Sequence, residues 1–352
     1  MKQDSENAAV STIGVDLGDK YSQLCALDGA GEIVEEGRIA TSASAFTRRF
    51  KTLEPCRIVI ETGTHANWVH DLLVGLGHEV VVANARKVRP ISANERKCDE
   101  LDARMLARLG RSDARLLQPV EVRPAQIRLD LCRIRARDAL VTARTMLVNS
   151  ARGLAKSMGA RLPSSSTNSL HRKELDPTVE LALKPLMKAL EGLTSRIKEC
   201  DKALGELSGK RYPQTARLQQ IKGVGPITSL YFVLAVADPC RFKDPRAIGS
   251  YFGIVPRRDQ SGGRDPQLRI TKCGDPLGRR LLVQCAQYIL GPFGADSDLR
   301  RFGLRLAAQG GMRAKKRAIV ATARKLAVLL FALLRKGEVY EPLRNSTKGQ
   351  AA

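Results

Sequence analysis

The sequence predicts a chain in three parts: a mixed α/β domain, an α-helical hairpin and a mainly α-helical C-terminal domain. Two changes of pattern along the 352 residues indicate this division. At first, short β-branched runs alternate with amphipathic stretches, whereas from about Pro124 to Gly209 a long helical periodicity takes over. The remainder is rich in turns and then helical again. We therefore expect domains at 10–123, 124–210 and 211–345, and the length allows two or three.

Three strands open the α/β domain and are followed by helix, strand, helix, strand and helix. The first three strands are expected at STIGVDLG, YSQLCALD and EIVEEGRIA, as an antiparallel meander. The later strands, CRIVIETG and EVVVANARKV, are near-continuous apolar runs of the kind buried on both faces of a sheet. Helices are expected at 42–53, 65–77 and 99–110. This mixed order fits a ribonuclease H-like sheet better than a strictly alternating doubly wound fold.

Residues 124–210 predict a coiled-coil hairpin whose two arms are joined by a polar, serine-rich loop at 162–177. The first arm covers about 125–158, and the second has an apolar heptad seam over four heptads. We expect the regular second helix to begin at Pro185, because proline is tolerated in a first turn. The seam residues are Val179, Leu183, Leu186, Leu190, Leu193, Ile197, Cys200, Leu204 and Leu207. They favour pairing with another copy, as a dimer or tetramer; the alternative is a spacer helix packed on its own chain.

The C-terminal part begins with a G-x-G turn between two helical stretches, in IKGVGPITS. A turn-rich region follows, and the chain then closes with a helix at about 311–337. That helix has eight basic residues and no acid. It is expected to grip phosphates, and the alternative is a solvated basic face.

The charge balance indicates a polyanionic partner. Lys and Arg outnumber Asp and Glu by 59 to 36, a net charge of +23, which favours nucleic acid or an anionic membrane. No apolar run approaches the roughly 18–20 residues that span a bilayer, and the N-terminus lacks the apolar stretch of a signal peptide. Eight scattered cysteines without a C-x-x-C pair indicate reduced thiols rather than disulfides or zinc. We therefore expect a cytoplasmic protein that binds nucleic acid and no membrane.

Four acids fall where strands end or a helix begins. Asp16 ends the first strand, Glu61 ends the fourth, and Asp99 and Asp102 share one face of a helix start. Carboxylates gathered at one point repel each other unless cations neutralise them, and two Mg²⁺ ions about 4 Å apart would clamp the reacting oxygens of a phosphodiester. Singly, Asp16 suits a turn and Asp99 an N-cap; together the four predict a catalytic magnesium site. Three other acids are expected in turns or facing solvent: Asp19, Asp28 and Glu100.

A serine lies in a basic, glycine-containing loop, in VPRRDQSGGRDPQLRITKCGDP. Gly262 and Gly263 would let a phosphate approach the Ser261 hydroxyl closely, and nearby cations would stabilise the charge of a transition state. No histidine lies nearby in sequence to activate the hydroxyl, so activation would come from elsewhere. Taken alone, such a loop is more typical of a linker or a phosphate contact. The expected nucleic-acid contacts are Arg258, Arg264, Arg269 and Lys272 here, and Lys315, Lys316 and Arg317 in the closing helix.

In this order, the segments IGVDLG, IETGTH, DELDAR and SGG…ITKCGDPLGRRLLVQ resemble the IS110 family of insertion-sequence transposases. These have a RuvC-like DEDD domain and a C-terminal serine domain, and IKGVGPITS resembles the helix-hairpin-helix-like segment that opens the latter. The resemblance covers about residues 11–345. One departure is that many members have an extra small residue between the glutamate and the T-G that follows it.

The resemblance implies specific roles. Asp16, Glu61, Asp99 and Asp102 would be the metal ligands, and Ser261 the nucleophile that bonds transiently to DNA. It also implies a structured non-coding RNA that pairs with donor and target DNA, and a multimer formed through the coiled coil. With only 4% aromatic residues, the chain is poorly suited to base stacking and better suited to backbone contacts.

Two other functions stay open at this point. One is a metal-dependent, structure-specific nuclease resembling a junction resolvase, in which water attacks and Ser261 is only a contact. The other is a non-catalytic nucleic-acid-binding protein descended from such an enzyme. Replacing Ser261 by alanine distinguishes the transposase from the nuclease. Loss of strand transfer with DNA binding retained would support the transposase, and surviving metal-dependent cleavage would support the nuclease.

Overall fold

The computed structural model describes residues 10–84, 98–266 and 268–345. These divide into two compact units at the bond between Arg123 and Pro124. None of the helices in these ranges is both long and apolar enough to cross a membrane. All eight cysteines lie in the described ranges, and each is a free thiol.

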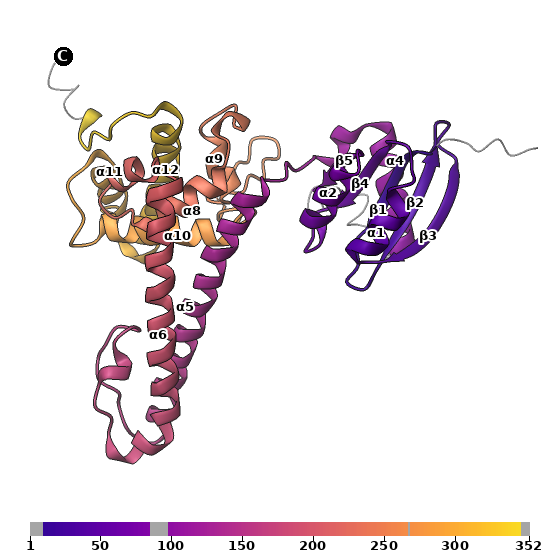
Figure 1. Ribbon diagram of the computed structural model, residues 1–352. Helices are drawn as coiled ribbons and strands as arrows, with labels where there is room; N and C mark the ends of the chain where they lie inside the picture. Colours follow the sequence, from indigo (N-terminus) through magenta and orange to yellow (C-terminus); the bar gives the residue numbers. More distant parts are fainter. Residues whose placement is uncertain (1–9, 85–97, 267, 346–352) are drawn as a thin grey trace, which may run out of the picture. The chain divides into compact units, whose positions relative to one another are not determined.

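The N-terminal unit is a five-stranded mixed sheet with helices on both faces (Figure 1). Its elements are β1 (Val10–Asp16), β2 (Tyr21–Asp28), β3 (Ile33–Ala40), α1 (Ala43–Phe50), β4 (Arg57–Glu61), α2 (Ala66–Gly75), β5 (Glu79–Ala83), α4 (Asp99–Ser112) and the 3₁₀ turn η1 (Ala114–Leu117). The order across the sheet is β3-β2-β1-β4-β5, with β1 to β3 antiparallel and β4 and β5 parallel to β1. The predicted succession of strands and helices is confirmed; residues 85–88 of the predicted fifth strand lie outside the described residues.

The period of two along the strands sends alternate side chains to the two faces. Ile13 and Ile58 pack with Phe46 and Val69 of α1 and α2. On the opposite face, Val59 packs with Leu106 of α4. Because both faces are covered, the inner strand β4 is apolar and buried at its three middle residues, as predicted.

Local signals place the helix ends of this unit. Ser42 caps α1 by accepting a hydrogen bond from the Ala45 amide, as the sequence predicts. Gly77 takes a φ of +95° directly after α2, which an L side chain resists. Asp28 forms the turn before Gly31, and its side chain accepts from the Gly31 and Glu32 amides.

The second unit starts with two long antiparallel helices, α5 (Ala125–Ser157) and α6 (Pro177–Arg211), seen side by side in Figure 1. The predicted start at Pro185 is wrong: α6 begins at Pro177, where Asp176 caps the Thr178 amide. A capping aspartate followed by proline is the stronger start signal, and Pro185 is accommodated inside the helix.

The apolar seam of α6 packs against α5 of the same chain. Val179 and Leu183 of α6 pack in one cluster with Ala151 and Ala155 of α5. Closer to the other end of the two helices, Arg137 of α5 forms an ion pair with Asp201 of α6. The seam is therefore covered without a second copy, as the alternative interpretation expects. An oligomer remains a prediction.

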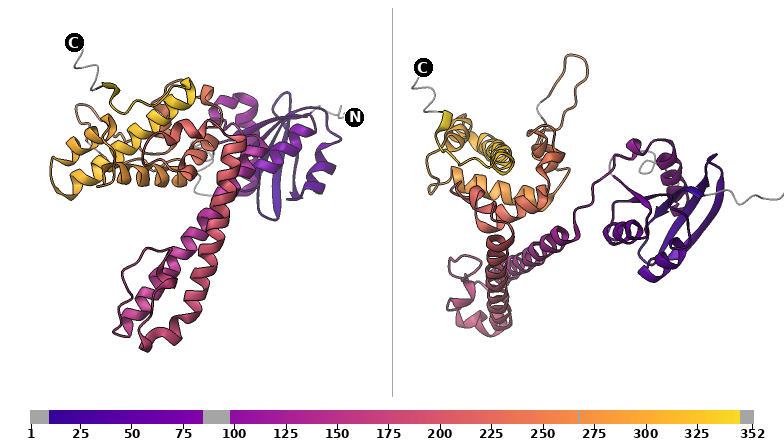
Figure 2. Two further views of the ribbon diagram at one scale, coloured as in Figure 1. Left: turned by 60° about the vertical axis from the view of Figure 1, so that its left-hand side comes forward. Right: turned by 45° about the horizontal axis from the view of Figure 1, so that its top comes forward.

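The rest of the second unit is a helical cluster with one projecting loop (Figure 2). Its elements are α7 (Thr215–Gln219), α8 (Pro226–Val236), the 3₁₀ turn η3 (Pro239–Arg241), α9 (Ala247–Tyr251), α10 (Pro276–Leu290), α11 (Asp298–Ala307) and α12 (Gly311–Lys336); a further 3₁₀ turn, η2 (Leu170–Arg172), lies between α5 and α6. The core is centred on α8, whose residues from Thr228 to Val236 are all buried. The G-x-G turn before α8 and the closing basic helix α12 lie where the sequence predicts them.

Candidate active site

Asp16 and Glu61 end neighbouring strands of the sheet. β1 and β4 run parallel with Val15 opposite Ile60, so the next residue of each strand is an acid. Adjacent strands lie about 4.8 Å apart, which brings the two backbones together at one edge. Both side chains are half-buried. The sheet therefore brings these two predicted site residues together.

Helix α4 brings two further acids toward the same edge. Gly14 lets the helix touch β1, because a Cβ there would collide with the backbone of Ala103 and Ala107. Nearer the other end of the helix, Gly110 lies against Val59 and Thr12. The helix thus runs antiparallel to β1, and its first turn lies toward the strand ends.

Within that first turn, the two predicted ligands differ in exposure. Asp99 is exposed, whereas Asp102 is only 5% exposed. Acids in a first turn are also favoured by the helix dipole. That effect explains an exposed Asp99, but it does not require a carboxylate to be buried. Asp102 is therefore the acid of α4 that most needs a functional explanation.

The side chains do not close into a ready-made metal site. Over residues 10–84, 98–266 and 268–345, no three side chains of His, Cys, Asp or Glu lie close enough together to hold an ion. The strand register and the packing of α4 bring the backbones of the four acids toward one edge of the unit, although their side chains do not form a closed site. Their role as ligands remains a prediction.

A histidine that the sequence reasoning passed over lies at this edge. His65 follows β4 by four residues, and its Nε2 lies 3.8 Å from the Asp19 carboxylate that follows β1. Trp68 Nε1 donates to His65 Nδ1 at 3.1 Å, which leaves the imidazole proton on Nε2 because an indole can only donate. The T-H pair directly after Glu61-Thr62-Gly63 was the available signal. Asp19 itself is 92% exposed, as expected.

Ser261 lies at the tip of a two-stranded projection formed by residues 253–266 and 268–275, here called the serine hairpin. Its strands are joined by the Arg257 amide donating to Arg269 O at 2.9 Å and by the Thr271 amide donating to Val255 O at 2.9 Å. At the tip, Ser261 and Arg264 exchange backbone hydrogen bonds around Gly262, whose φ is +56°. The Ser261 side chain is exposed, so a phosphate could reach it.

The predicted cations are spread along the serine hairpin instead of surrounding Ser261. Arg264 is at the tip, and Arg258 forms an ion pair with Asp265 at 3.5 Å. Arg269 lies opposite Arg257, between the foot of the hairpin and its tip. Lys272 lies at the foot, where its amide donates to Gly253 O. Only Arg258 and Arg264 are therefore placed to serve a phosphate at Ser261.

The remaining predicted cations lie in the first turns of α12. Lys315, Lys316 and Arg317 are exposed, while Ala314 before them and Ala318 after them are buried. The helix thus presents one basic side to solvent and one apolar side to the core. This surface suits contact with a phosphate backbone.

Two family models match the chain. One, described as Transposase and covering the DEDD domain of IS110 elements, matches residues 13–159; the other, Transposase IS116/IS110/IS902 family, matches residues 215–296. The first range contains the four acids and the second contains Ser261.

Full-length relatives agree with these matches. The transposase for insertion sequence element IS1111A of Coxiella burnetii is 28% identical over 340 residues, 94% of this chain and 91% of its own. The Sinorhizobium fredii protein y4rJ is 30% identical over 359 residues, 92% of this chain and 88% of its own. The transposase for insertion sequence element IS1328 of Yersinia enterocolitica is 28% identical over 287 residues, 79% and 83% of the two chains.

Proposed function

The chain belongs to the IS110 family of insertion-sequence transposases, which cut and rejoin DNA, and we propose that it does so with Ser261 as nucleophile and a carboxylate-bound metal site. The metal ligands would be Asp16, Glu61, Asp99 and Asp102. The observation that carries the proposal is the convergence of two strand ends and the α4 start, with Asp102 buried there.

The N-terminal unit is assigned a ribonuclease H-like, RuvC-like fold. The order β3-β2-β1-β4-β5, with an antiparallel first half and a parallel second half, supports this assignment. In such a sheet the carboxyl ends of parallel strands meet at one edge, which is where Asp16 and Glu61 lie.

The donor set fits a hard divalent cation. Four carboxylates are the hard oxygen ligands that Mg²⁺ prefers, and two ions would balance their charge. When bound, the ions would polarise the scissile phosphate and stabilise the negative charge that develops on its oxygens. The chain itself fixes the carboxylates, because they lie on strand ends and a helix packed against them at Gly14.

Ser261 would act by transesterification. Its Oγ would bond to phosphorus while one bond from phosphorus to a deoxyribose oxygen breaks, and the Oγ proton would leave as that oxygen gains one. A hydroxyl of the second strand would then reverse the exchange, so that the number of phosphodiester bonds is conserved. Arg258 and Arg264 are placed to hold the phosphate oxygens.

The partners are DNA, a structured non-coding RNA that supplies the sequence choice, and further copies of this chain in a dimer or tetramer. The exposed cations of α12 and the scarcity of aromatic residues support binding through the nucleic-acid backbone. We place the reaction in the bacterial cytoplasm, at the nucleoid. Full-rate recombination by purified protein free of RNA would refute the RNA part.

The test is Ser261→Ala in the full-length protein, with Ser250→Ala on the exposed side of α9 as the matched control. We expect Ser261→Ala to abolish strand transfer and to abolish a covalent protein–DNA adduct, while DNA binding is retained. Ser250→Ala should behave as the parent. Metal-dependent cleavage that survives Ser261→Ala would instead support the structure-specific nuclease with water as nucleophile.

A further inference from the structure

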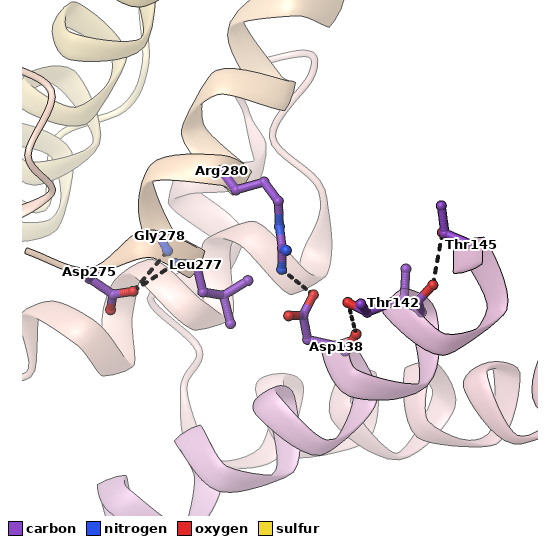
Figure 3. Close-up of polar contacts among 8 residues, drawn as sticks. Asp138, Thr142, Thr145, Asp275, Leu277, Gly278 and Arg280 are labelled. Carbon is purple, nitrogen blue, oxygen red and sulfur yellow. Dashed lines mark hydrogen bonds and ion pairs between the residues drawn. The ribbon is translucent and has the colours of Figure 1, made fainter. Parts of the chain in front are cut away.

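Asp138 on α5 and Arg280 on α10 form an ion pair outside the serine hairpin (Figure 3). We propose that these two are positioning residues for the reaction at Ser261, because their ion pair ties the foot of the serine hairpin to α5. The proposal rests on the role proposed above for Ser261, and it adds the residues that hold the nucleophile in place.

The two feet of the serine hairpin are locked to each other. Gly253 has a φ of +64° and Gly274 a φ of +110°. A Cβ on Gly253 would run into the carbonyl oxygen of Cys273, and one on Gly274 into that of Tyr251. The backbones therefore cross in direct contact, and the hairpin can change direction only if its foot moves as one piece.

That foot is fixed to the first turn of α10. Asp275 caps the helix, with Oδ1 accepting from the Leu277 amide at 3.0 Å and the Gly278 amide at 3.1 Å (Figure 3). Its Oδ2 accepts from the hydroxyl of buried Tyr231 on α8. Burial raises the pKa of Tyr231, so the phenol keeps its proton and remains a donor.

A second bond ties the other foot to the same turn. Arg279 Nη1 donates to the carbonyl oxygen of Phe252 at 3.0 Å, directly before Gly253. Both strands of the serine hairpin thus end on the first turn of α10. A tilt of this turn would be carried to Ser261 at the tip.

Arg280 is the next residue in the turn, and it reaches across to Asp138. Arg137, the residue before Asp138, forms an ion pair with Asp201 of α6 at 2.8 Å. The ion-pair partner of the Asp138 carboxylate is therefore Arg280 and not this adjacent arginine. Beside the pair, α5 and α10 diverge around a groove of about 740 Å³, lined by residues that include Thr142 and Gln284. The ion pair therefore joins the two helices at the side of this groove.

The pair should matter for position more than for stability. The side chains are 46% and 26% exposed, and ion pairs this exposed contribute little to the stability of a fold. A nucleophile displaced by about 1 Å, in contrast, loses on the order of a hundredfold in rate. Loss of the pair is therefore expected to lower kcat and to leave DNA affinity unchanged.

Charge reversal tests this directly. Asp138→Arg and Arg280→Asp are made singly and together in the full-length protein, and strand transfer is measured with DNA spanning the element's ends and RNA transcribed from its non-coding flank. Each single variant should lower kcat by about 10- to 100-fold, with KM for DNA within about twofold and the melting temperature within about 3 °C. The double variant, which restores the pair in reverse, should recover most of the rate.

A matched control is Arg196 with Glu199, an exposed pair within α6 whose N–O distance is 2.7 Å. Reversing it should leave kcat unchanged, because it joins no two elements. A single Asp138 or Arg280 variant with the parent's kcat, or a double variant no faster than the singles, would overturn the proposal.

Hydrogen exchange of residues 253–275 separates this proposal from that for Ser261. The single variants should exchange faster there and the double variant at the parent's rate, whatever reaction Ser261 performs. If Ser261→Ala still transfers strands, the proposed nucleophile is wrong. The exchange rates would still show whether the ion pair between Asp138 and Arg280 restrains the serine hairpin. Unchanged exchange in the single variants would show that it does not.

Discussion

Each unit of the molecule buries an aspartate on a helix, and the two lie in different parts of their units. Asp130 on α5 is fully buried among donors: Tyr212 Oη donates to it at 2.8 Å, Arg211 Nη1 at 3.0 Å, and Arg133 lies at 3.3 Å. Asp102 on α4 is 5% exposed and lies toward the edge where other acids gather.

This difference separates a structural carboxylate from a functional one. Removing one partner of a buried ion pair destabilises a fold, because the other charge loses its counter-charge. A buried carboxylate at an edge where other acids end their strands is positioned to share a divalent cation with them. The comparison therefore predicts opposite effects when each aspartate is replaced by its neutral isostere.

The largest effect is expected for Asp102→Asn. Strand transfer should fall by about a thousandfold, because a metal ligand contributes several kcal/mol to the transition state. Asparagine keeps the size of the side chain, so the variant should still fold and show a cooperative thermal transition. Single-turnover kinetics measure the rate and thermal denaturation measures folding. The control is Asp19→Asn, an exposed residue near the same edge, which should keep the parent's rate and melting temperature. Full activity in Asp102→Asn would contradict the assignment.

The next largest effect is expected for Gly14→Ala, which disturbs the contact between β1 and α4 that positions Asp102. Gly14→Ala puts a methyl group against the backbone of Ala103 and Ala107, so α4 must move away from β1. We expect a loss of about 3 kcal/mol in the free energy of unfolding, together with reduced strand transfer. Gly37→Ala on β3, where a Cβ meets nothing within 4 Å, should be nearly neutral by urea denaturation. Equal stability of the two variants would show that α4 is not held at Gly14.

Asp130→Asn should reverse the pattern of Asp102→Asn. It leaves Arg211 and Arg133 without their counter-charge, and we expect a loss of about 2 kcal/mol in stability. The enzyme that remains folded should keep its kcat, since Asp130 lies in no proposed site. A stability equal to the parent's would mean that this buried carboxylate is not structural.

The contribution of Asp130 to the free energy of unfolding should depend on pH. Burial alone would raise the pKa of Asp130, but the hydrogen bonds from Tyr212, Gln126 and Arg211 outweigh it and hold the pKa below the ordinary 3.8. A lowered pKa adds stability that is complete well above pH 3.8 and is lost as the pH falls below it. Urea titrations of the parent and of Asp130→Asn should therefore converge on acidification.

Much of the acidic edge could be predicted from the sequence, because local rules fix it. Apolar runs identify β1 and β4, and an acid that ends each run must lie at the edge if the strands are parallel neighbours. The start of α4 likewise follows from its own acids and periodicity. What no local rule gives is that α4 packs on β1 at Gly14, which makes Asp102 buried and Asp99 exposed.

The second unit was harder to predict, because its pattern allows more than one partner. A heptad seam on α6 fits a second copy as well as it fits α5, and only the fold shows that α5 covers it. The cations near Ser261 in sequence were expected around it. The two sides of the hairpin pair instead, so Lys272 lies opposite Gly253 at the foot, away from Ser261 at the tip.

The smallest effect is expected for Glu36→Gln, and it tests what holds α4 in place. Arg104 of α4 pairs with Glu36 of β3, with Nη2 2.7 Å from Oε2, and this hydrogen bond lowers the pKa of Glu36. Both side chains are about a third exposed, so the loss should be about 0.5 kcal/mol. If backbone packing at Gly14 positions Asp102, strand transfer should be unchanged. A loss of activity as large as that of Gly14→Ala would instead assign the positioning of Asp102 to this ion pair.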